Sequence, residues 1–324
     1  MNSVSRRKLL VTAGTFGAGA FAASLLPRMA WAGPMGLPVG IQLYSVGKPL
    51  AEDMPGTLKQ LHELGYREVE SAGVGKRTAK ELRGLLDDAG LVCPSAHLQL
   101  TGDDLDAQFE QAHTLGAHFA VSSVLRSFSP AFIKSATAGN APAGAAAPAE
   151  QAPPKRPAME PMGLDGFKKT AKKMNEVGKK AKAAGLQYAY HNHNFEFEKM
   201  PDGGPGYDVL IQETDPDLVK FEIDCGWMTV AGSDPVAYFK KYPGRFRMLH
   251  IKDFKPVAQP TIALLGPGRP QGTDLGTGFI DYKPIFAAGK AAGIEHIFVE
   301  QEAPFAVSQL DSAKVDYAYL QKLS

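Results

Sequence analysis

The chain has few cysteines and almost no net charge, and both features exclude whole classes of protein. Cys93 and Cys225 are the only cysteines among 324 residues, so a disulfide framework is impossible, and without a CxxC pair we expect no zinc–thiolate site. We expect both to be buried free thiols, with one disulfide as the alternative in an oxidising compartment. The formal net charge is +1 and no basic run has interleaved aromatics, so we expect no nucleic-acid partner.

Long apolar runs are also scarce, and the one near the N-terminus carries export signals. Residues 5–10 are SRRKLL, a twin-arginine pattern, and residues 30–32 are AWA, an A-x-A cleavage signal. We therefore expect a signal peptide over residues 1–32 and a periplasmic protein exported in the folded state. The apolar stretch between the two signals is short and rich in Gly and Ala, so we expect no stable membrane span in the mature form. An uncleaved membrane anchor is the alternative.

From Val39 onward, short apolar runs alternate with longer amphipathic segments. The predicted strands cover 39–46, 68–72, 92–100, 119–125, 186–194, 219–227, 246–254 and 296–302. The predicted helices cover 53–65, 78–90, 104–116, 164–185, 207–215, 234–242, 281–293 and 306–323. Eight strand–helix units predict an α/β fold, a single parallel (β/α)8 TIM barrel over residues 33–324.

Two segments interrupt this rhythm. Residues 136–160 are mostly Ala, Pro and Gly, so we expect a flexible insertion after the fourth strand, either a lid or a plain spacer. Residues 255–279 form a second long loop, which should overhang the carboxyl ends of the strands. Barrel active sites lie at that end.

Four consecutive predicted strands end in a residue that can bind a hard or borderline metal: His191, Asp224, His250 and Glu300. Taken singly, a histidine in such a position is more often structural, and an acidic residue more often caps a helix or pairs with arginine. Adjacent parallel strands lie about 4.8 Å apart, so the four ends together can share one ion. Imidazole and carboxylate ligands suit one divalent ion of Mn, Zn, Co, Fe or Mg.

Over nearly all of residues 33–324 the chain resembles the sugar phosphate isomerase/epimerase family with the xylose isomerase-like barrel, in its secreted branch. The resemblance is carried by GIQLYS at 40–45, GYREVE at 65–70, YHNHNFEF at 190–197, HIKD at 250–253 and VEQ at 299–301. It implies one divalent metal held by Glu, Asp, His and Glu at the ends of strands five to eight. Asp224, His250 and Glu300 match that set, whereas His191 stands where the family has its first Glu.

This departure affects the chemistry that the resemblance implies. Family epimerases exchange the substrate proton between two Glu residues, and here one of that pair is an imidazole, which can also act as a base. We expect the metal to chelate a sugar carbonyl while Glu300 or His191 removes the α-proton. His193 is a further candidate, as a ligand, a partner of the ligands or an acid. Lys252 is a candidate for binding an oxyanion, and Asp253 for a helix cap or a salt bridge.

The first three strands add candidates for binding sugar hydroxyls, namely Gln42, Glu70 and His97. The sequence thus predicts a metal-dependent isomerase or epimerase of a sugar or keto-sugar. A 3-keto-glycoside lyase or hydrolase and a non-catalytic sugar-binding barrel are the alternatives. The secreted setting favours the lyase somewhat, because free sugar phosphates are scarce in a periplasm. A homo-oligomer is left open.

Overall fold

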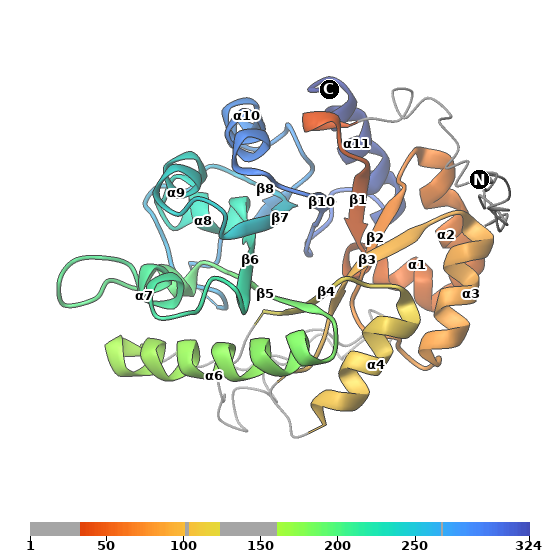
Figure 1. Cartoon of the computed structure of the whole chain (residues 1–324). Coiled ribbons are helices and arrows are strands. Elements are labelled where there is room, and N and C mark those ends of the chain that lie inside the picture. The colour runs from red at the N-terminus through yellow and green to blue at the C-terminus, as the bar shows by residue number, and fades with distance from the viewer. Residues whose placement is uncertain (1–32, 101–103, 124–160, 267) are drawn as a thin grey trace, which may run out of the picture. The chain divides into compact units, whose positions relative to one another are not determined.

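The computed structural model describes residues 33–100, 104–123, 161–266 and 268–324, and a closed barrel of parallel strands forms their centre (Figure 1). Around the barrel the order is β1-β10-β7-β6-β5-β4-β3-β2, so barrel strands that are consecutive along the chain are neighbours in space, and β10 closes the ring against β1. The predicted single α/β barrel is therefore confirmed. The predicted signal peptide at 1–32 and the predicted insertion at 136–160 lie outside the described residues.

The barrel strands are β1 (Val39–Gln42), β2 (Glu68–Ser71), β3 (Val92–His97), β4 (Phe119–Ser122), β5 (Gln187–His191), β6 (Val219–Asp224), β7 (Phe246–Ile251) and β10 (His296–Val299). Two short antiparallel strands are β8 (Asp253–Phe254) and β9 (Gly272–Thr273). The α-helices are α1 (Gly47–Glu52), α2 (Met54–Leu64), α3 (Ala79–Ala89), α4 (Leu105–Leu115), α6 (Gly163–Ala183), α7 (Gly206–Gln212), α8 (Cys225–Val230), α9 (Pro235–Lys241), α10 (Tyr282–Ala292) and α11 (Gln309–Gln321). Single 3-10 turns are η2 (Pro34–Gly36), η3 (Leu43–Val46) and η4 (Phe195–Phe197).

Every predicted strand and helix has a counterpart, but the predicted strands extend too far at their carboxyl ends. Residues 43–46, predicted as strand, form η3, and residues 225–227 of the predicted strand 219–227 belong to α8. The polar strand-end residues explain the early stops. The carboxylate of Asp224 accepts the backbone N–H of Trp227 at 2.7 Å, and the side-chain oxygen of Gln42 accepts that of Tyr44 at 2.9 Å. Each contact turns the chain into a helical conformation.

Helix ends follow from local chemistry. Thr78 and Glu81 form a reciprocal capping box at the start of α3, and Gly90 ends that helix in a left-handed conformation with φ of 72°. Cys93 and Cys225 are buried and free. Among the described residues, helices with the length and apolar character of a membrane span do not occur.

Two kinds of layer fill the barrel. Residues two apart on a strand face the same side and are separated by about 6.6 Å along it. Five buried side chains form a lower apolar cluster, here called the apolar floor: Phe119, Val121, Ala189, Met248 and Phe298. The next lumen-facing residues toward the carboxyl ends are polar, and they build the site.

Candidate active site

The four predicted metal ligands meet at the carboxyl end of the barrel. One ligand atom from each of His191, Asp224, His250 and Glu300 lies within 4.8 Å of the others, and we call these residues the mouth cluster. Nδ1 of His250 lies 3.0 Å from Oε2 of Glu300, and Nε2 of His191 lies 3.9 Å from Oδ2 of Asp224. Neighbouring parallel strands β5, β6, β7 and β10 place them side by side.

Lys252 lies against the same carboxylates. Its ammonium is 2.7 Å from Glu300, 3.3 Å from Asp224 and 2.7 Å from Glu302. It also lies 5.0 Å from the centre of the Trp227 ring, a cation–π contact. Burial acts to lower the pKa of Lys252, but the carboxylates outweigh burial and raise it, so the side chain is a cation at neutral pH.

The two mouth carboxyls differ in their electrostatics. Burial raises the pKa of Asp224 to about 6, although the Lys252 ammonium opposes this shift. Burial also acts to raise the pKa of Glu300, but Lys252 and His250 outweigh it and hold that pKa well below its usual range. The side chain of Glu300 is 12% exposed, whereas that of Asp224 is fully buried. Glu300 is therefore the ionised carboxylate of this pair that solvent and substrate can reach.

A second group lies one layer deeper, and we call it the inner cluster: His97, His191, Glu222 and His250. Oε2 of Glu222 is 3.0 Å from Nε2 of His97, 3.1 Å from Nδ1 of His191 and 3.2 Å from Nε2 of His250. Burial and the nearby charge of Glu70 raise the pKa of Glu222 to about 7. Sequence reasoning missed Glu222, although its position two residues before Asp224 on β6 places both side chains on one face.

The residues predicted to bind sugar hydroxyls lie at this deeper level. Glu70 is completely buried and accepts hydrogen bonds from Gln42 at 3.0 Å and from Ser95 at 2.5 Å, and it contacts His250 at 2.6 Å. Burial acts to lower the pKa of His97, but the carboxylates of Glu70 and Glu222 outweigh it and raise that pKa to about 10. Glu70 thus connects β1, β2, β3 and β7, and substrate binding by these residues stays a prediction.

His193 lies beyond the end of β5 rather than on it, which corrects the predicted strand. Its ring centre is 5.1 Å from that of His191, and its buried Nδ1 has no hydrogen-bond partner among the described residues. Burial lowers the pKa of His193 to about 4, so its ring is neutral at physiological pH. The backbone N–H of His193 donates to Glu196 at 2.9 Å, and this contact holds the turn after the strand.

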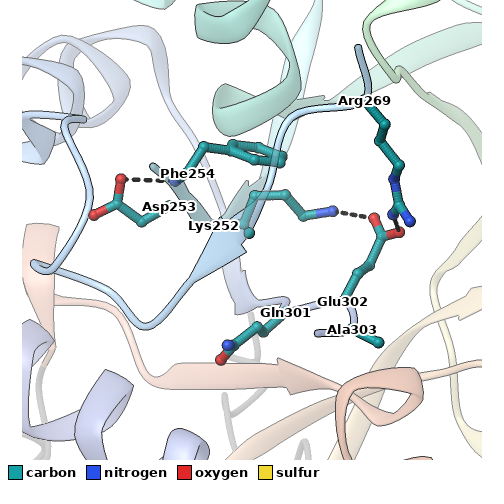
Figure 2. A pocket seen from close by; sticks show the side chains of 8 residues that line it. Lys252, Asp253, Phe254, Arg269, Gln301, Glu302 and Ala303 are labelled. Atoms are coloured by element: carbon teal, nitrogen blue, oxygen red, sulfur yellow. Dashed lines mark hydrogen bonds and ion pairs between the residues drawn. The ribbon is translucent and has the colours of Figure 1, made fainter. Parts of the chain in front are cut away.

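A pocket opens beside the mouth cluster (Figure 2). The residues lining it are Lys252, Asp253, Phe254, Arg269, Gly272, Gln301, Glu302 and Ala303. In Figure 2 the side chains of Lys252 and Arg269 both point toward the Glu302 carboxylate, and ion pairs join them to it. Both amide atoms of the buried Gln301 side chain lack hydrogen-bond partners among the described residues.

Arg269 brings the long loop before α10 over the mouth, as predicted. Asn194 also contacts this loop, because its amide donates to the carbonyls of Thr261 and Ala263 at 3.1 and 3.2 Å. Asp253 has neither of its predicted roles. Its carboxylate accepts backbone N–H groups of the segment 276–280.

The mouth cluster fits a divalent metal. Oδ2 of Asp224 is buried and makes no hydrogen bond among the described residues, and the Lys252 ammonium lies 3.3 Å from it, so this oxygen is one that a closer cation would satisfy. Two imidazoles and two carboxylates are ligands that Mn, Zn, Co and Fe accept. The Lys252 ammonium competes for the same oxygens, so a bound ion would share or displace it.

The barrel and its strand-end ligands define a class of protein, and the comparisons agree with it. The chain belongs to the xylose isomerase-like TIM barrel family, whose sequence profile matches residues 58–322. A sugar phosphate isomerase/epimerase from Parabacteroides distasonis has a similar structure, with a TM-score of 0.65 and 26% identity over 90% of this chain and 95% of the other. A xylose isomerase-like barrel protein from Mycobacterium smegmatis in complex with magnesium has a TM-score of 0.57 and 17% identity, covering 90% of this chain and 96% of the other.

Curated relatives with similar sequences include dehydratases. An inosose dehydratase from Lacticaseibacillus casei is 30% identical over 148 residues, which is 43% of this chain and 48% of the relative. The match thus spans about half the length of that relative.

Proposed function

We propose that this protein removes the proton next to the carbonyl of a sugar-like ketone and then eliminates the oxygen substituent on the next carbon. It would therefore be a lyase of the dehydratase or keto-glycoside type. The observation that carries the proposal is the asymmetry of the mouth cluster. Glu300 is an ionised and partly exposed carboxylate, whereas β5, separated from β10 by β7 and β6, offers His191, which is buried and contacts Glu222. Elimination needs one base and a group that stabilises the departing oxygen, rather than a base on each face of the substrate.

Each side chain of the site has a role in this proposed reaction. His191, Asp224, His250 and Glu300 would hold one divalent metal, which when bound polarises a carbonyl and stabilises the negative charge that develops on its oxygen. Glu300 takes the α-proton, because it is ionised at neutral pH and accessible. The ammonium of Lys252, 2.7 Å from Glu300, stabilises the charge on the oxygen that leaves.

The pocket supports a neutral substrate. Lys252 and Arg269 line it, but Arg269 is paired with Glu302 and Lys252 with both Glu300 and Glu302, so two carboxylates already compensate the two cations. A phosphate would have to break these ion pairs. The free amide of Gln301 offers a donor and an acceptor for sugar hydroxyls. The matches to inosose dehydratases, enzymes named for removing water from a polyol ketone, also favour elimination.

Isomerisation or epimerisation is the second candidate. The unpartnered Nδ1 of His193 gives a position from which a proton could return to the substrate. The similarity to the Parabacteroides distasonis protein supports the same candidate.

One experiment separates the two. The protein is incubated with 3-keto-glycosides and keto-sugars in D2O, with Mn2+, Zn2+, Co2+ or Mg2+, and the products are followed by NMR. Loss of the α-proton with formation of an enone and release of water or alcohol would support the lyase. Deuterium at the α-carbon in a new epimer or isomer would support the second candidate. If no α-proton exchanges with any ion, both proposals are wrong.

A further inference from the structure

The inner cluster gathers more ligand atoms than the proposed function uses. Three imidazole nitrogens, from His97, His191 and His250, lie 3.0–3.2 Å from one oxygen of Glu222. Neighbouring ligand atoms in a tetrahedral zinc site with bonds of about 2.0–2.1 Å are about 3.3 Å apart. Small outward shifts of these side chains would therefore admit an ion.

Hydrogen bonds alone leave this cluster incompletely satisfied. Nε2 of His250 can carry one proton, yet it faces two carboxylates, Glu70 at 2.6 Å and Glu222 at 3.2 Å. Nε2 of His97 likewise faces Glu70 at 3.1 Å and Glu222 at 3.0 Å. In addition, Oε1 of Glu222 is buried and has no hydrogen-bond partner among the described residues. The Nε2 groups of His250 and His97 can thus donate only two hydrogen bonds to four carboxylate contacts, and Oε1 of Glu222 accepts none.

Different nitrogen groups of the chain lie against the carboxylates of the mouth cluster and of the inner cluster. At the mouth, the ammonium of Lys252 lies between Glu300 and Asp224. One layer deeper, Glu70 and Glu222 contact imidazoles, which bind a metal once they are deprotonated.

We propose that His97, His191, Glu222 and His250 form a second divalent-cation site that overlaps the mouth cluster and is an alternative to it, with Glu70 as an adjacent carboxylate. Because three of its four ligands are imidazoles, it should favour Zn2+ or Co2+ over Mg2+. His191 and His250 belong to both clusters, and each presents a different nitrogen to each one. A neutral imidazole has a single lone pair, so an ion in the inner site takes these two ligands away from the mouth cluster.

The test measures Zn2+ affinity of the full chain by competition with a chromophoric chelator. Glu222→Gln and His97→Ala change ligands that belong only to the inner cluster, while Asp224→Asn is the matched change of a ligand that belongs only to the mouth cluster. We expect the first two variants to lose at least about 100-fold in Zn2+ affinity and Asp224→Asn to lose less than about threefold. Co2+ should give an intense four-coordinate visible spectrum in the wild type and in Asp224→Asn, and not in Glu222→Gln.

Two outcomes would overturn the proposal. Wild-type Zn2+ affinity in both Glu222→Gln and His97→Ala would show that the inner cluster binds no ion. An equal loss in Asp224→Asn would place the ion at the mouth. Circular dichroism and thermal melts show whether each variant is folded, and the near-isosteric Glu222→Gln is the variant less exposed to misfolding. The readout is affinity, so failure here leaves the proposed lyase activity untouched, and failure of the activity leaves this site untouched.

Discussion

Strand β10 and the residue after it contribute to both the apolar floor and the mouth cluster. Phe298 lies in the apolar floor and is completely buried, while Glu300, two residues on, belongs to the mouth cluster. On β7, Met248 belongs to the floor and His250 to the mouth cluster in the same way. The comparison teaches that two residues along a strand, about 6.6 Å, separate packing from chemistry.

The two levels differ in how burial acts on stability. In the floor, burial removes apolar surface from water and stabilises the fold by about 25 cal/mol per Å2. At the mouth, burial removes carboxylates from water at a cost, and the Lys252 ammonium, 3.3 Å from Asp224 and 2.7 Å from Glu300, offsets part of that cost. The floor thus holds the strands in the arrangement that the mouth needs.

The largest expected effect is on activity at the mouth. Glu300→Gln removes the proposed base without changing its size, and we expect kcat for α-proton removal to fall about 1,000-fold. The melting temperature should fall less than in the floor variant that follows. Deuterium exchange into the substrate, measured by NMR, checks the first expectation, and a thermal melt checks the second. Exchange at the wild-type rate would contradict the role of Glu300.

The matching change in the apolar floor should lower stability strongly and activity little. Phe298→Ala empties a large volume in a fully buried site, and we expect the free energy of unfolding to fall by about 3–5 kcal/mol. Turnover per folded molecule should change little. Urea denaturation measures the stability, with Phe298→Leu as the milder control. A loss of stability in Glu300→Gln as large as in Phe298→Ala would erase the distinction between the two levels.

Periodicity was enough to predict the barrel, because its strands are buried and its helices amphipathic. The four residues His191, Asp224, His250 and Glu300 could be predicted to converge, since parallel strands that close into a barrel end on one face. The extra lengths of the predicted strands have a local cause. Hydropathy continues unchanged from β6 into α8, and the turn between them depends on the hydrogen bond of Asp224.

The inner cluster was harder to predict. Glu222 shares a face with Asp224, so the period of two could have indicated it. Its contact with His97 depends on the closure of the barrel, because β3 and β6 are far apart in sequence and are not adjacent strands. The pairing of Arg269 with Glu302 joins a loop to the end of a strand, and no sequence periodicity describes such a contact.

A smaller effect should come from the chain's own cation at the mouth. Lys252→Met removes the ammonium that competes for Glu300 and Asp224, so we expect Mn2+ to bind the mouth cluster about tenfold more tightly, or about 1.4 kcal/mol. Turnover should nevertheless fall, because the departing oxygen loses its stabilising charge. Calorimetry of Mn2+ binding measures the affinity, and Lys255→Met serves as a control. Weaker binding in Lys252→Met would show that the ammonium supports the metal site.

The last prediction concerns Asp316 on α11, a buried carboxyl outside both clusters. Its side chain accepts the backbone N–H of Leu275 at 2.7 Å, and burial raises its pKa to about 8 from an ordinary value of 3.8. The folded protein therefore keeps a proton that the unfolded chain loses above pH 4, so this residue makes stability fall as pH rises from about 4 to 8. Asp316→Asn removes that titration, and its stability relative to the wild type should rise with pH by at most about 1.4 kcal/mol per unit. Urea denaturation at pH 5, 6, 7 and 8 measures the difference. A difference that stays constant over this range would show that Asp316 is already ionised in the folded protein. Burial without a nearby cation would then not be enough to keep this carboxyl protonated.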